Sequence, residues 1–416
     1  MELPKYSMGI GDRFAHQGAA QLDALIRARD QGVVVAPVWN KSHREHTIVS
    51  SSPGDVRVEA DEAVAARGWT APYFVDADHI GLATVDAFIE SSDFFTLDVA
   101  DFIEGEPEAS DLSRFVEKHR GRIGQLRIPG IDEQFEITEK TIEDAARKFL
   151  LAVREAGRIY RHVEEAKGAE TFVTEVSMDE TERPQTPVEL LFILAAVADE
   201  GIPAQTIAPR FTGRFNKGVD YVGDVGQFAK EFEQDLAVIA FAVEEFGLPA
   251  RLKLSVHSGS DKFSIYGPMR DALRKFDAGV HLKTAGTTWL EELIGLATAG
   301  GDGLQLAKEI YKIALSRMGE FAAPYASVID IDPAGLPSEQ TVGSWDEEAL
   351  ASALRHDPVC EAYNSSFRQL LHISYKVAAE MGDRFLEMLE KHARVIAAGV
   401  TENIFERHLR PLFMNE

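Results

Sequence analysis

The stretch ARLKLSVHSGSDKFSIYGPMRDALRKFDAGVHLKTAGTTWLEELIGLATAG, residues 250–300, contains one structural pattern twice in succession. In each half, a short apolar run (250–260 and 279–286) leads into a longer segment with apolar residues at helical spacing (266–276 and 288–300). Short strands that alternate with helices of this length pair in parallel through right-handed crossovers. The stretch therefore predicts two consecutive β/α units.

The same pattern continues toward the N-terminus. Six more apolar runs are followed by segments that favour helix, at residues 5–11, 33–40, 73–79, 93–103, 171–178 and 204–211. Eight alternations predict an α/β fold of the (β/α)8 type, a TIM-like barrel. An open, doubly wound sheet is the alternative, but the first strand lacks its GxGxxG fingerprint and continues as Gly9-Ile10-Gly11-Asp12-Arg13-Phe14.

Two of the expected helices have clear sequence signals, and a third is expected from its place in the alternation. Residues 81–90 are expected to form the helix of the third unit. A long helix is expected from Thr138, because apolar residues follow it along one stripe. Another helix opens on a capping box, Thr186-Pro187-Val188-Glu189, in which Pro stands at the first helical position. These helices would cover the outside of the barrel.

Two regions depart from the alternation. Residues 105–138 form a polar excursion after the fourth strand, for which a lid over the site is one hypothesis. Beyond about residue 330 the pattern is only helical. We therefore expect a barrel over 1–330 that includes this excursion, and a C-terminal helical extension over 331–416 packed on the barrel.

The composition restricts the class of protein. The 416 residues are 45% apolar and 27% charged, which is ordinary for a globular enzyme. A net charge of −25 without a basic stripe argues against a nucleic-acid partner. A single cysteine, Cys360, excludes an intramolecular disulfide and a cysteine-based metal cluster. With no apolar signal segment and no membrane span, we expect a cytoplasmic protein; a homo-oligomer stays open.

Chemistry-bearing residues collect where the predicted strands end, which is the functional face of such a barrel. His79, His257 and His281 fall at the ends of strands three, seven and eight, and Asp78 and Glu175 lie nearby. A lone histidine at a strand end is more often structural than a ligand. Three at one rim beside carboxylates instead favour a divalent metal site, for zinc, nickel, manganese or iron.

Acidic residues also recur with the two-residue period of a strand. Asp76 and Asp78 share one face, and Glu175 shares its face with Ser177 and Asp179. An acid that faces inward is costly to bury without a partner. We therefore expect each to meet a metal, a lysine or a substrate hydroxyl.

Charged residues at the same predicted rim are candidates for binding an anionic substrate. They are Asp12, Arg13, Arg210, Lys217, Asp261, Lys262 and Lys283. Charge balance for the neighbouring acids is the alternative explanation. The small residues of HSGSDKF, 257–263, would let backbone N–H groups approach a ligand, so a sugar phosphate is also open. The absence of an HxH pair after the first strand, of GxSxG and of HExxH sets aside three hydrolase classes.

Six strings carry a family resemblance. In order they are GIGDRF, DADH, EVSMDETERPQTP, RFTGRFNKGVDYVGDVGQF, LSVHSGSDKFSIY and HLKTAGTTWLE, between about residues 8 and 295. In order and spacing they resemble the tagaturonate epimerase family, whose members interconvert tagaturonate and fructuronate with a divalent metal. The resemblance implies Asp78 as proton acceptor, Glu175 as proton donor, and His79 and His257 as metal ligands, with His281 as a third. It also implies that Lys217 and Lys262 hold the substrate.

The segment after the second strand departs from the family pattern. It reads WNKSHREHTIVSSS, 39–52, where a stretch rich in glutamine and arginine is expected. A loop here, with His43, Arg44 and His46, would overhang the site, so the particular sugar acid stays open.

The implied reaction inverts the fourth carbon of a 2-ketouronate. Because that carbon is not α to the ketone, we interpret the reaction as retro-aldol cleavage followed by aldol addition. The alternatives are another metal-dependent sugar-acid or ketose isomerase or aldolase, and a non-catalytic barrel that binds sugar acids.

Overall fold

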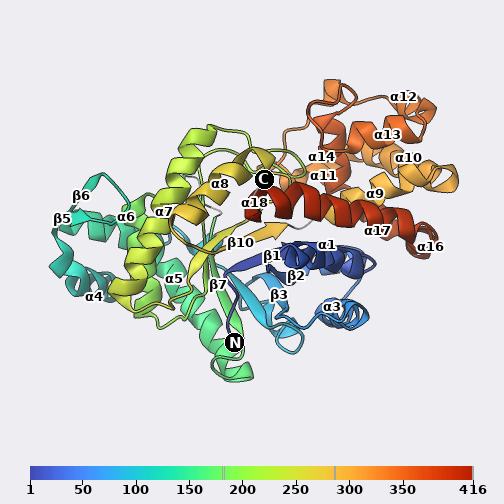
Figure 1. Cartoon of the computed structure of the whole chain (residues 1–416). Helices are drawn as coiled ribbons and strands as arrows, with labels where there is room; N and C mark the ends of the chain where they lie inside the picture. The colour runs from blue at the N-terminus through green and yellow to red at the C-terminus, as the bar shows by residue number, and fades with distance from the viewer. Residues whose placement is uncertain (180, 182, 285–286, 415–416) are drawn as a thin grey trace.

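The computed structural model describes residues 1–179, 181, 183–284 and 287–414 (Figure 1). It confirms the predicted barrel: eight parallel strands close in the order β1-β10-β9-β8-β7-β4-β3-β2. The strands are β1 (Tyr6–Ile10), β2 (Ala36–Ser42), β3 (Phe74–Ile80), β4 (Phe94–Asp98), β7 (Val173–Met178), β8 (Thr206–Pro209), β9 (Lys253–Val256) and β10 (Val280–Thr284).

The interior of the barrel changes from apolar to polar along the strands. Its N-terminal end is filled by a buried apolar cluster of Leu3, Ala36, Val38, Phe74, Phe94 and Val173. Residues two apart in a strand face the same side. Phe74 is therefore followed toward the carboxyl end by Asp76, Phe94 by Thr96, and Val173 by Glu175. The apolar cluster forms the floor beneath a buried polar layer.

The outer layer of the barrel consists of the helices that follow the strands. They are α1 (Gly18–Asp30), α3 (Pro53–Arg67), α5 (Glu139–Lys167), α6 (Pro187–Asp199), α7 (Val225–Phe246), α8 (Phe263–Lys275) and α9 (Thr287–Ala299). Both predicted helix starts are confirmed. Thr138 caps α5, and at α6 the Thr186 side chain accepts from the Glu189 N–H while Glu189 accepts from the Thr186 N–H.

The helix predicted over residues 81–90 is wrong. The structure has only a single 3₁₀ turn there, η1 (Val85–Ala87). Two apolar side chains of this segment, Val85 and Phe88, are both buried. They are three residues apart, a spacing that one 3₁₀ turn satisfies as well as an α-helix does. The C-terminal half of α5 packs beside this segment, with His162 Nε2 2.6 Å from Asp86 Oδ1.

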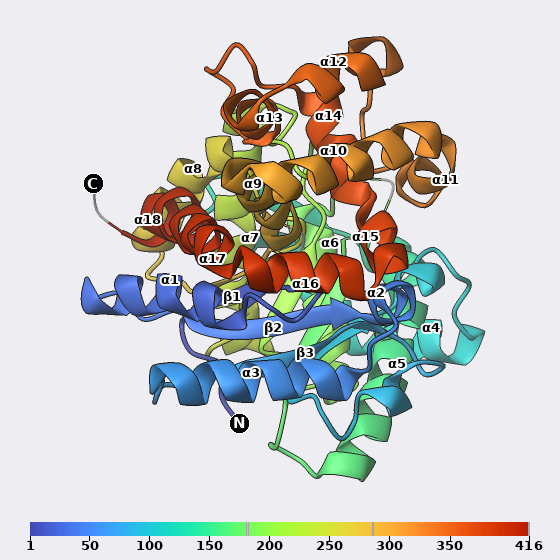
Figure 2. The ribbon, with the colours of Figure 1, turned by 90° about the vertical axis from the view of Figure 1, so that its right-hand side faces the viewer.

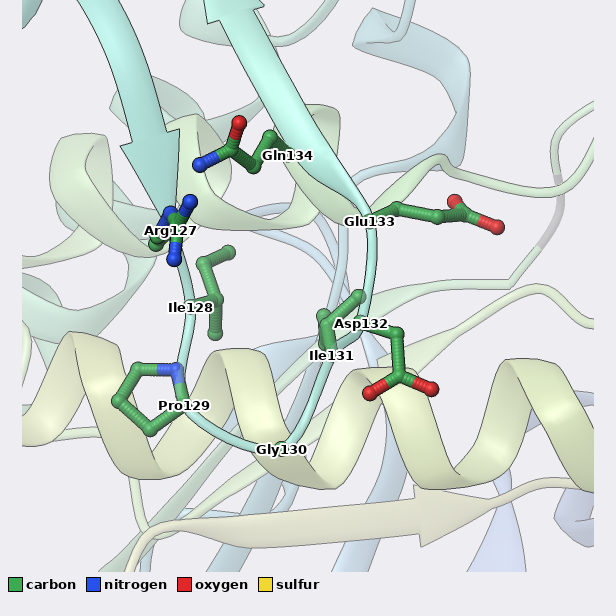
Figure 3. A pocket seen from close by; sticks show the side chains of 8 residues that line it. All are labelled: Arg127, Ile128, Pro129, Gly130, Ile131, Asp132, Glu133 and Gln134. Carbon is green, nitrogen blue, oxygen red and sulfur yellow. The ribbon is translucent and has the colours of Figure 1, made fainter.

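The excursion at 105–138 folds into α4 (Ala109–His119), a 3₁₀ turn and the antiparallel hairpin β5 (Gly124–Arg127) and β6 (Gln134–Ile137). Its ion pairs are with outer helices: His119 with Asp199 at the end of α6, and Arg122 with Glu245 in α7. The tip of the hairpin forms a shallow pocket of its own (Figure 3). These contacts place the segment against the side of the barrel, which does not support the lid hypothesis.

The chain after α9 is helical, and its last helices complete the outer layer. The helices are α10 (Gly301–Ser316), α11 (Met318–Ala322), α12 (Glu339–Ser344), α13 (Glu347–Leu354), α14 (Ser365–Ile373), α15 (Tyr375–Met381), α16 (Asp383–Lys391), α17 (Ala393–Glu402) and α18 (Arg410–Phe413), the last two joined by a π-helical segment (Asn403–Leu409). α17 packs against α1 and α9, and α18 packs on α8 (Figures 1 and 2).

This packing is specific. Thr401 Oγ1 donates to the carbonyl of Ala20 at 2.8 Å, and a Cβ on Gly295 would lie 2.6 Å from Ile396 Cγ1. The helical region starts at Gly301, and the division into 1–330 and 331–416 stays a prediction. Among the helices of the described residues, none has the length and apolarity needed to cross a membrane.

Candidate active site

One buried lysine and three carboxylates form the centre of the polar layer. Lys283 Nζ lies 2.9 Å from Asp76 Oδ2, 2.8 Å from Asp78 Oδ1 and 3.1 Å from Glu175 Oε1. Burial disfavours the charge on Lys283, but the three carboxylates outweigh burial and hold its pKa well above its ordinary value. We refer to these four residues as the Lys283 centre. Lys283 therefore neutralises these acids, which matches the charge-balance alternative to its predicted role in substrate binding.

Two threonines fix the positions of these carboxylates. Thr96 Oγ1 lies 3.0 Å from Asp76 Oδ1 and 3.2 Å from Glu175 Oε1, and Thr206 Oγ1 donates to Glu175 Oε2 at 2.8 Å. Burial raises the pKa of Asp76 to about 7, although Lys283 opposes this rise. Asp76 can therefore hold or release a proton near neutral pH. The sequence had placed Asp76 on the face of Asp78 but had not given it a role.

A bulge brings His79 to the same side as Asp78. The register of β3 against β4 shifts between Ala77 and Ile80, and His79 has a left-handed backbone with φ of 53°. In a regular strand, Asp78 and His79 would face opposite sides. Here His79 Nε2 lies 3.8 Å from Asp78 Oδ1 and His79 Nδ1 lies 3.4 Å from Asp98 Oδ2. The bulge thus turns His79 toward the site.

His257 follows β9 and lies against His79. Their ring centroids are 5.0 Å apart with an interplanar angle of 77°. His257 Nε2 lies 2.7 Å from Glu175 Oε1, and its Nδ1 lies 3.3 Å from Asp179 Oδ1. Burial disfavours the imidazolium, but Asp179 and Glu175 raise the pKa of His257 to about 10. Without a metal, this histidine is therefore protonated at neutral pH.

The structure does not bring His281 to this pair, which corrects the expected three-histidine cluster. His281 is the second residue of β10 and lies one side-chain layer below Lys283. Its Nδ1 lies 3.0 Å from Ser7 Oγ, and its ring packs on Phe94 with centroids 5.2 Å apart. Burial lowers its pKa to about 3. His281 is thus a neutral residue of the barrel floor.

The His79–His257 pair has the donor chemistry of a divalent metal site. Metal-bound histidines usually hold one ring nitrogen to a carboxylate and use the other as ligand. His257 matches this in part, because Nε2 lies against Glu175 and Nδ1 lies beside Asp179 without a well-formed hydrogen bond; His79 Nδ1 faces Asp98. Within the described residues, however, no three or more such side chains already surround one point. The donors fit a metal in kind, but their arrangement is not that of a closed metal site.

Three residues predicted to bind substrate have other partners: Asp12 and Lys262 bind backbone groups, and Asp261 binds a buried arginine. Both carboxylate oxygens of Asp12 accept backbone N–H groups of residues 14–17. Lys262 Nζ donates to the carbonyls of Asn216, Val219 and Ser260 at 2.7–2.9 Å. Asp261 pairs with the buried Arg368 of α14 at 2.9 Å. These predictions are corrected. Backbone groups buried away from water need partners, which Asp12 and Lys262 supply, and the buried Arg368 needs a carboxylate, which Asp261 supplies.

The remaining predicted cations lie at the rim. Arg210 Nη1 donates to the carbonyl of Asp179 at 3.2 Å, and Lys217 Nζ donates to Ser258 Oγ at 3.2 Å. Arg13 Nε donates to Glu45 Oε1 at 3.0 Å. Glu45 belongs to α2 (His43–Val49), so the loop expected after β2 is a helix. Its signal was Ser42 and Glu45, which form a capping box.

Comparison with known proteins identifies the family of this chain. A model of the family described as UxaE, tagaturonate epimerase, matches residues 1–412. The chain belongs to the tagaturonate epimerase family. A tagaturonate/fructuronate epimerase of Thermotoga maritima is 29% identical over 423 aligned residues, covering 97% of this chain and 80% of that protein. The family predicted from the six strings is therefore confirmed.

Solved structures agree on the fold. The fructuronate-tagaturonate epimerase UxaE of Cohnella laeviribosi in a glycerol complex superposes with a TM-score of 0.81 at 24% identity, covering 99% of this chain and 82% of that one. Its native crystal structure gives a TM-score of 0.79 over the same shares. At this level of identity, the superposition supports the architecture alone.

Proposed function

We propose that this chain is a divalent-metal-dependent isomerase that interconverts tagaturonate and fructuronate by inverting the fourth carbon. The observation that carries the proposal is the Lys283 centre beside the His79–His257 pair, both at the carboxyl ends of the strands. Family membership and the activity named for the Thermotoga maritima relative support the same reaction.

His79 and His257 would hold the metal, with Asp179 as a neighbouring carboxylate. A divalent cation there supplies Lewis acidity, which draws charge from the ketone oxygen and the hydroxyl beside it. A histidine ligand must be neutral, whereas the pKa of His257 is raised to about 10, so metal binding should release its proton. Zinc, nickel, manganese and iron all suit this donor set.

The position of the ketone favours carbon–carbon bond cleavage. The hydrogen on the fourth carbon is not acidified by a ketone at the second. If the fourth-carbon hydroxyl loses its proton, the bond between carbons three and four can break, and its electron pair stays on the ketone side as an enediolate. The new aldehyde rotates, the third carbon adds to its opposite face, and the alkoxide recovers a proton.

Asp78 is the proposed acceptor of the hydroxyl proton. Burial would raise its pKa, but Lys283 and His79 hold that pKa well below the ordinary value, so Asp78 is ionised. Lys283 contacts both Asp78 and Asp76, and the pKa of Asp76 is raised to about 7. A proton taken by Asp78 can therefore pass through Lys283 to Asp76 and return by the same path.

Glu175 fits a different role from the proton donor that the resemblance implied. Burial would raise the pKa of Glu175, but Lys283 and His257 keep this pKa well below its ordinary value. Its oxygens face the donors Thr206, His257 and Lys283. We assign Glu175 to orienting His257, in the manner of a carboxylate behind a metal-bound histidine.

Epimerisation in heavy water tests the proposal. The metal-loaded protein is incubated with tagaturonate in deuterium oxide, and the fructuronate formed is examined by NMR. Bond cleavage predicts no deuterium on the fourth carbon, and deuterium there would rule this route out. No conversion with zinc, nickel, manganese or iron would refute the activity itself, and a screen of ketohexoses and other ketouronates would then identify a different isomerase or aldolase.

A further inference from the structure

A second polar cluster lies at the same rim, and the C-terminal helices form part of its wall. Arg13 follows β1, Glu45 lies in α2, and Tyr375 begins α15. The Arg13 guanidinium carbon lies 4.0 Å from the centre of the Tyr375 ring, and Arg13 Nε donates to Glu45 at 3.0 Å. Arg13 and Tyr375 are only 8% and 1% exposed, so their contact is enclosed.

This cluster contains buried polar atoms without partners. Arg13 Nη1 and His372 Nδ1 are buried and make no hydrogen bond to a described residue, and Tyr375 Oη, which lies near Tyr325, is within hydrogen-bond geometry of no other group. A buried donor that has lost water and gained no partner is costly, and most such groups in proteins are satisfied. Two of these atoms belong to side chains in direct contact with each other, Arg13 and Tyr375. Their shared surroundings are therefore suited to a ligand that accepts hydrogen bonds.

The sign of charge separates this cluster from the Lys283 centre. Three cations act here, Arg13, Lys217 and Arg44; Arg13 pairs with Glu45, and Lys217 is influenced more by Glu45 than by Asp78. Around Lys283, by contrast, three carboxylates surround one ammonium group. A negatively charged ligand group is repelled by the second arrangement and attracted by the first.

We infer that Arg13, Tyr375 and Lys217 bind the carboxylate of the substrate, so that a residue of the C-terminal helices selects uronates over neutral ketoses. The inference rests on the proposed function, because it assumes a ketouronate substrate. Lys217 Nζ donates to Ser258 Oγ, and Ser258 follows His257 in the chain, so the cluster and the histidine pair adjoin. The ketone end then lies toward the histidines and the carboxylate end toward Arg13.

Asp78 is close to both ends of the substrate in this arrangement. It contacts Lys283, and its charge also acts on Lys217 and Glu45, so it lies near both clusters. The fourth carbon of a six-carbon ketouronate lies between its ketone and its carboxylate. The orientation therefore brings the reacting hydroxyl to the residue proposed to accept its proton.

Binding measured by calorimetry tests the inference without depending on turnover. The metal-loaded protein is titrated with an equilibrated mixture of tagaturonate and fructuronate, and separately with tagatose, which carries a hydroxymethyl group in place of the carboxylate. Tyr375→Phe keeps the ring on Arg13 and removes only Oη. We expect uronate binding to weaken about 10- to 100-fold, as for the loss of a hydrogen bond to a charged group, while tagatose binding is unchanged.

Arg13→Lys is a second variant, which keeps the charge beside Glu45 but removes Nη1, and it should show the same selective loss. Tyr311→Phe is the matched control, because its hydroxyl donates to the Pro337 carbonyl elsewhere in the C-terminal region. In steady-state kinetics Tyr375→Phe should raise KM and leave kcat nearly unchanged.

Equal weakening of both ligands in Tyr375→Phe, or no weakening of uronate binding, would overturn the inference. If the wild-type protein prefers uronates through Arg13 and Tyr375 yet never inverts the fourth carbon, the proposed function fails while the subsite stands. The two failures are therefore distinguishable.

Discussion

Replacing Lys283 by methionine tests whether one ammonium group stabilises three buried acids. The substitution keeps a similar apolar stem and leaves Asp76, Asp78 and Glu175 without the cation that lies 2.8–3.1 Å from them. Removing one partner of a buried ion pair costs about 3–5 kcal/mol. Unfolding entropy of about 2.1 cal/mol/K per residue gives about 0.9 kcal/mol/K for 416 residues. The Tm should therefore fall by about 3–6 °C.

The pH dependence of that loss identifies its cause. In Lys283→Met, burial without the cation raises the folded-state pKa of the carboxylates above their unfolded values. Such groups destabilise the fold increasingly as pH rises through the unfolded pKa, so the deficit should be larger at pH 8 than at pH 5. Adding Asp76→Asn should recover part of the stability at pH 8, because it removes one uncompensated charge.

Thermal and urea unfolding of the wild type, Lys283→Met and Lys283→Met/Asp76→Asn measure these effects. A deficit that is the same at both pH values, together with a double variant less stable than the single one, would refute the electrostatic account. Activity is expected to be lost in both variants, since each interrupts the path between Asp78 and Asp76.

Other predictions concern single groups. His257→Ala should lose stoichiometric metal and activity while the fold survives, and elemental analysis showing retained metal would contradict the assignment. Thr96→Val removes the hydroxyl 3.0 Å from Asp76 Oδ1 and 3.2 Å from Glu175 Oε1, so we expect kcat to fall at least about tenfold and unfolding free energy by about 1–3 kcal/mol; an unchanged kcat would be the opposing result. Asp235→Asn should raise the unfolding free energy of the protein at pH 7. Burial and Glu231 raise the folded-state pKa of Asp235 well above its ordinary value. The wild-type protein therefore loses stability as the pH rises above the unfolded-state pKa of this group. The extra stability of Asp235→Asn, measured by urea unfolding, should accordingly be smaller at pH 4 than at pH 7.

The barrel could be predicted from sequence because its signals are local. Each β/α unit shows its own apolar run and its own helix, and the capping box at Thr186 marks a helix start without any tertiary information. The helix predicted for the third unit was wrong because a local signal can fit two structures. Val85 and Phe88 have a spacing that both an α-helix and a 3₁₀ turn satisfy, so the spacing alone does not decide between them.

The candidate site could be predicted only in part, because depth within the barrel is a matter of register. His281 pairs with Ser7 and Ser255 and is the second residue of its strand, so it lies in the floor although its sequence surroundings resemble a strand end. His79 was predicted at the rim, but the two-residue period would have turned it away from Asp78. The bulge that reverses this is defined by pairing with β4, which a single sequence does not reveal.

The cluster around Arg13 could not be predicted from the sequence either. The periodicity of the C-terminal segment predicts helices that pack on the barrel. These helices do not belong to a β/α unit, so the sequence does not indicate which of their residues reaches the rim. Tyr375 does so because α15 lies against α2, which carries Glu45. The fold thereby combines an acid-rich centre built by the strands with a cation-rich wall completed by α2 and α15. A ketouronate suits both parts, because its ketone can lie at the acid-rich centre and its carboxylate at the cation-rich wall. A neutral ketose has no charged group for the cation-rich wall.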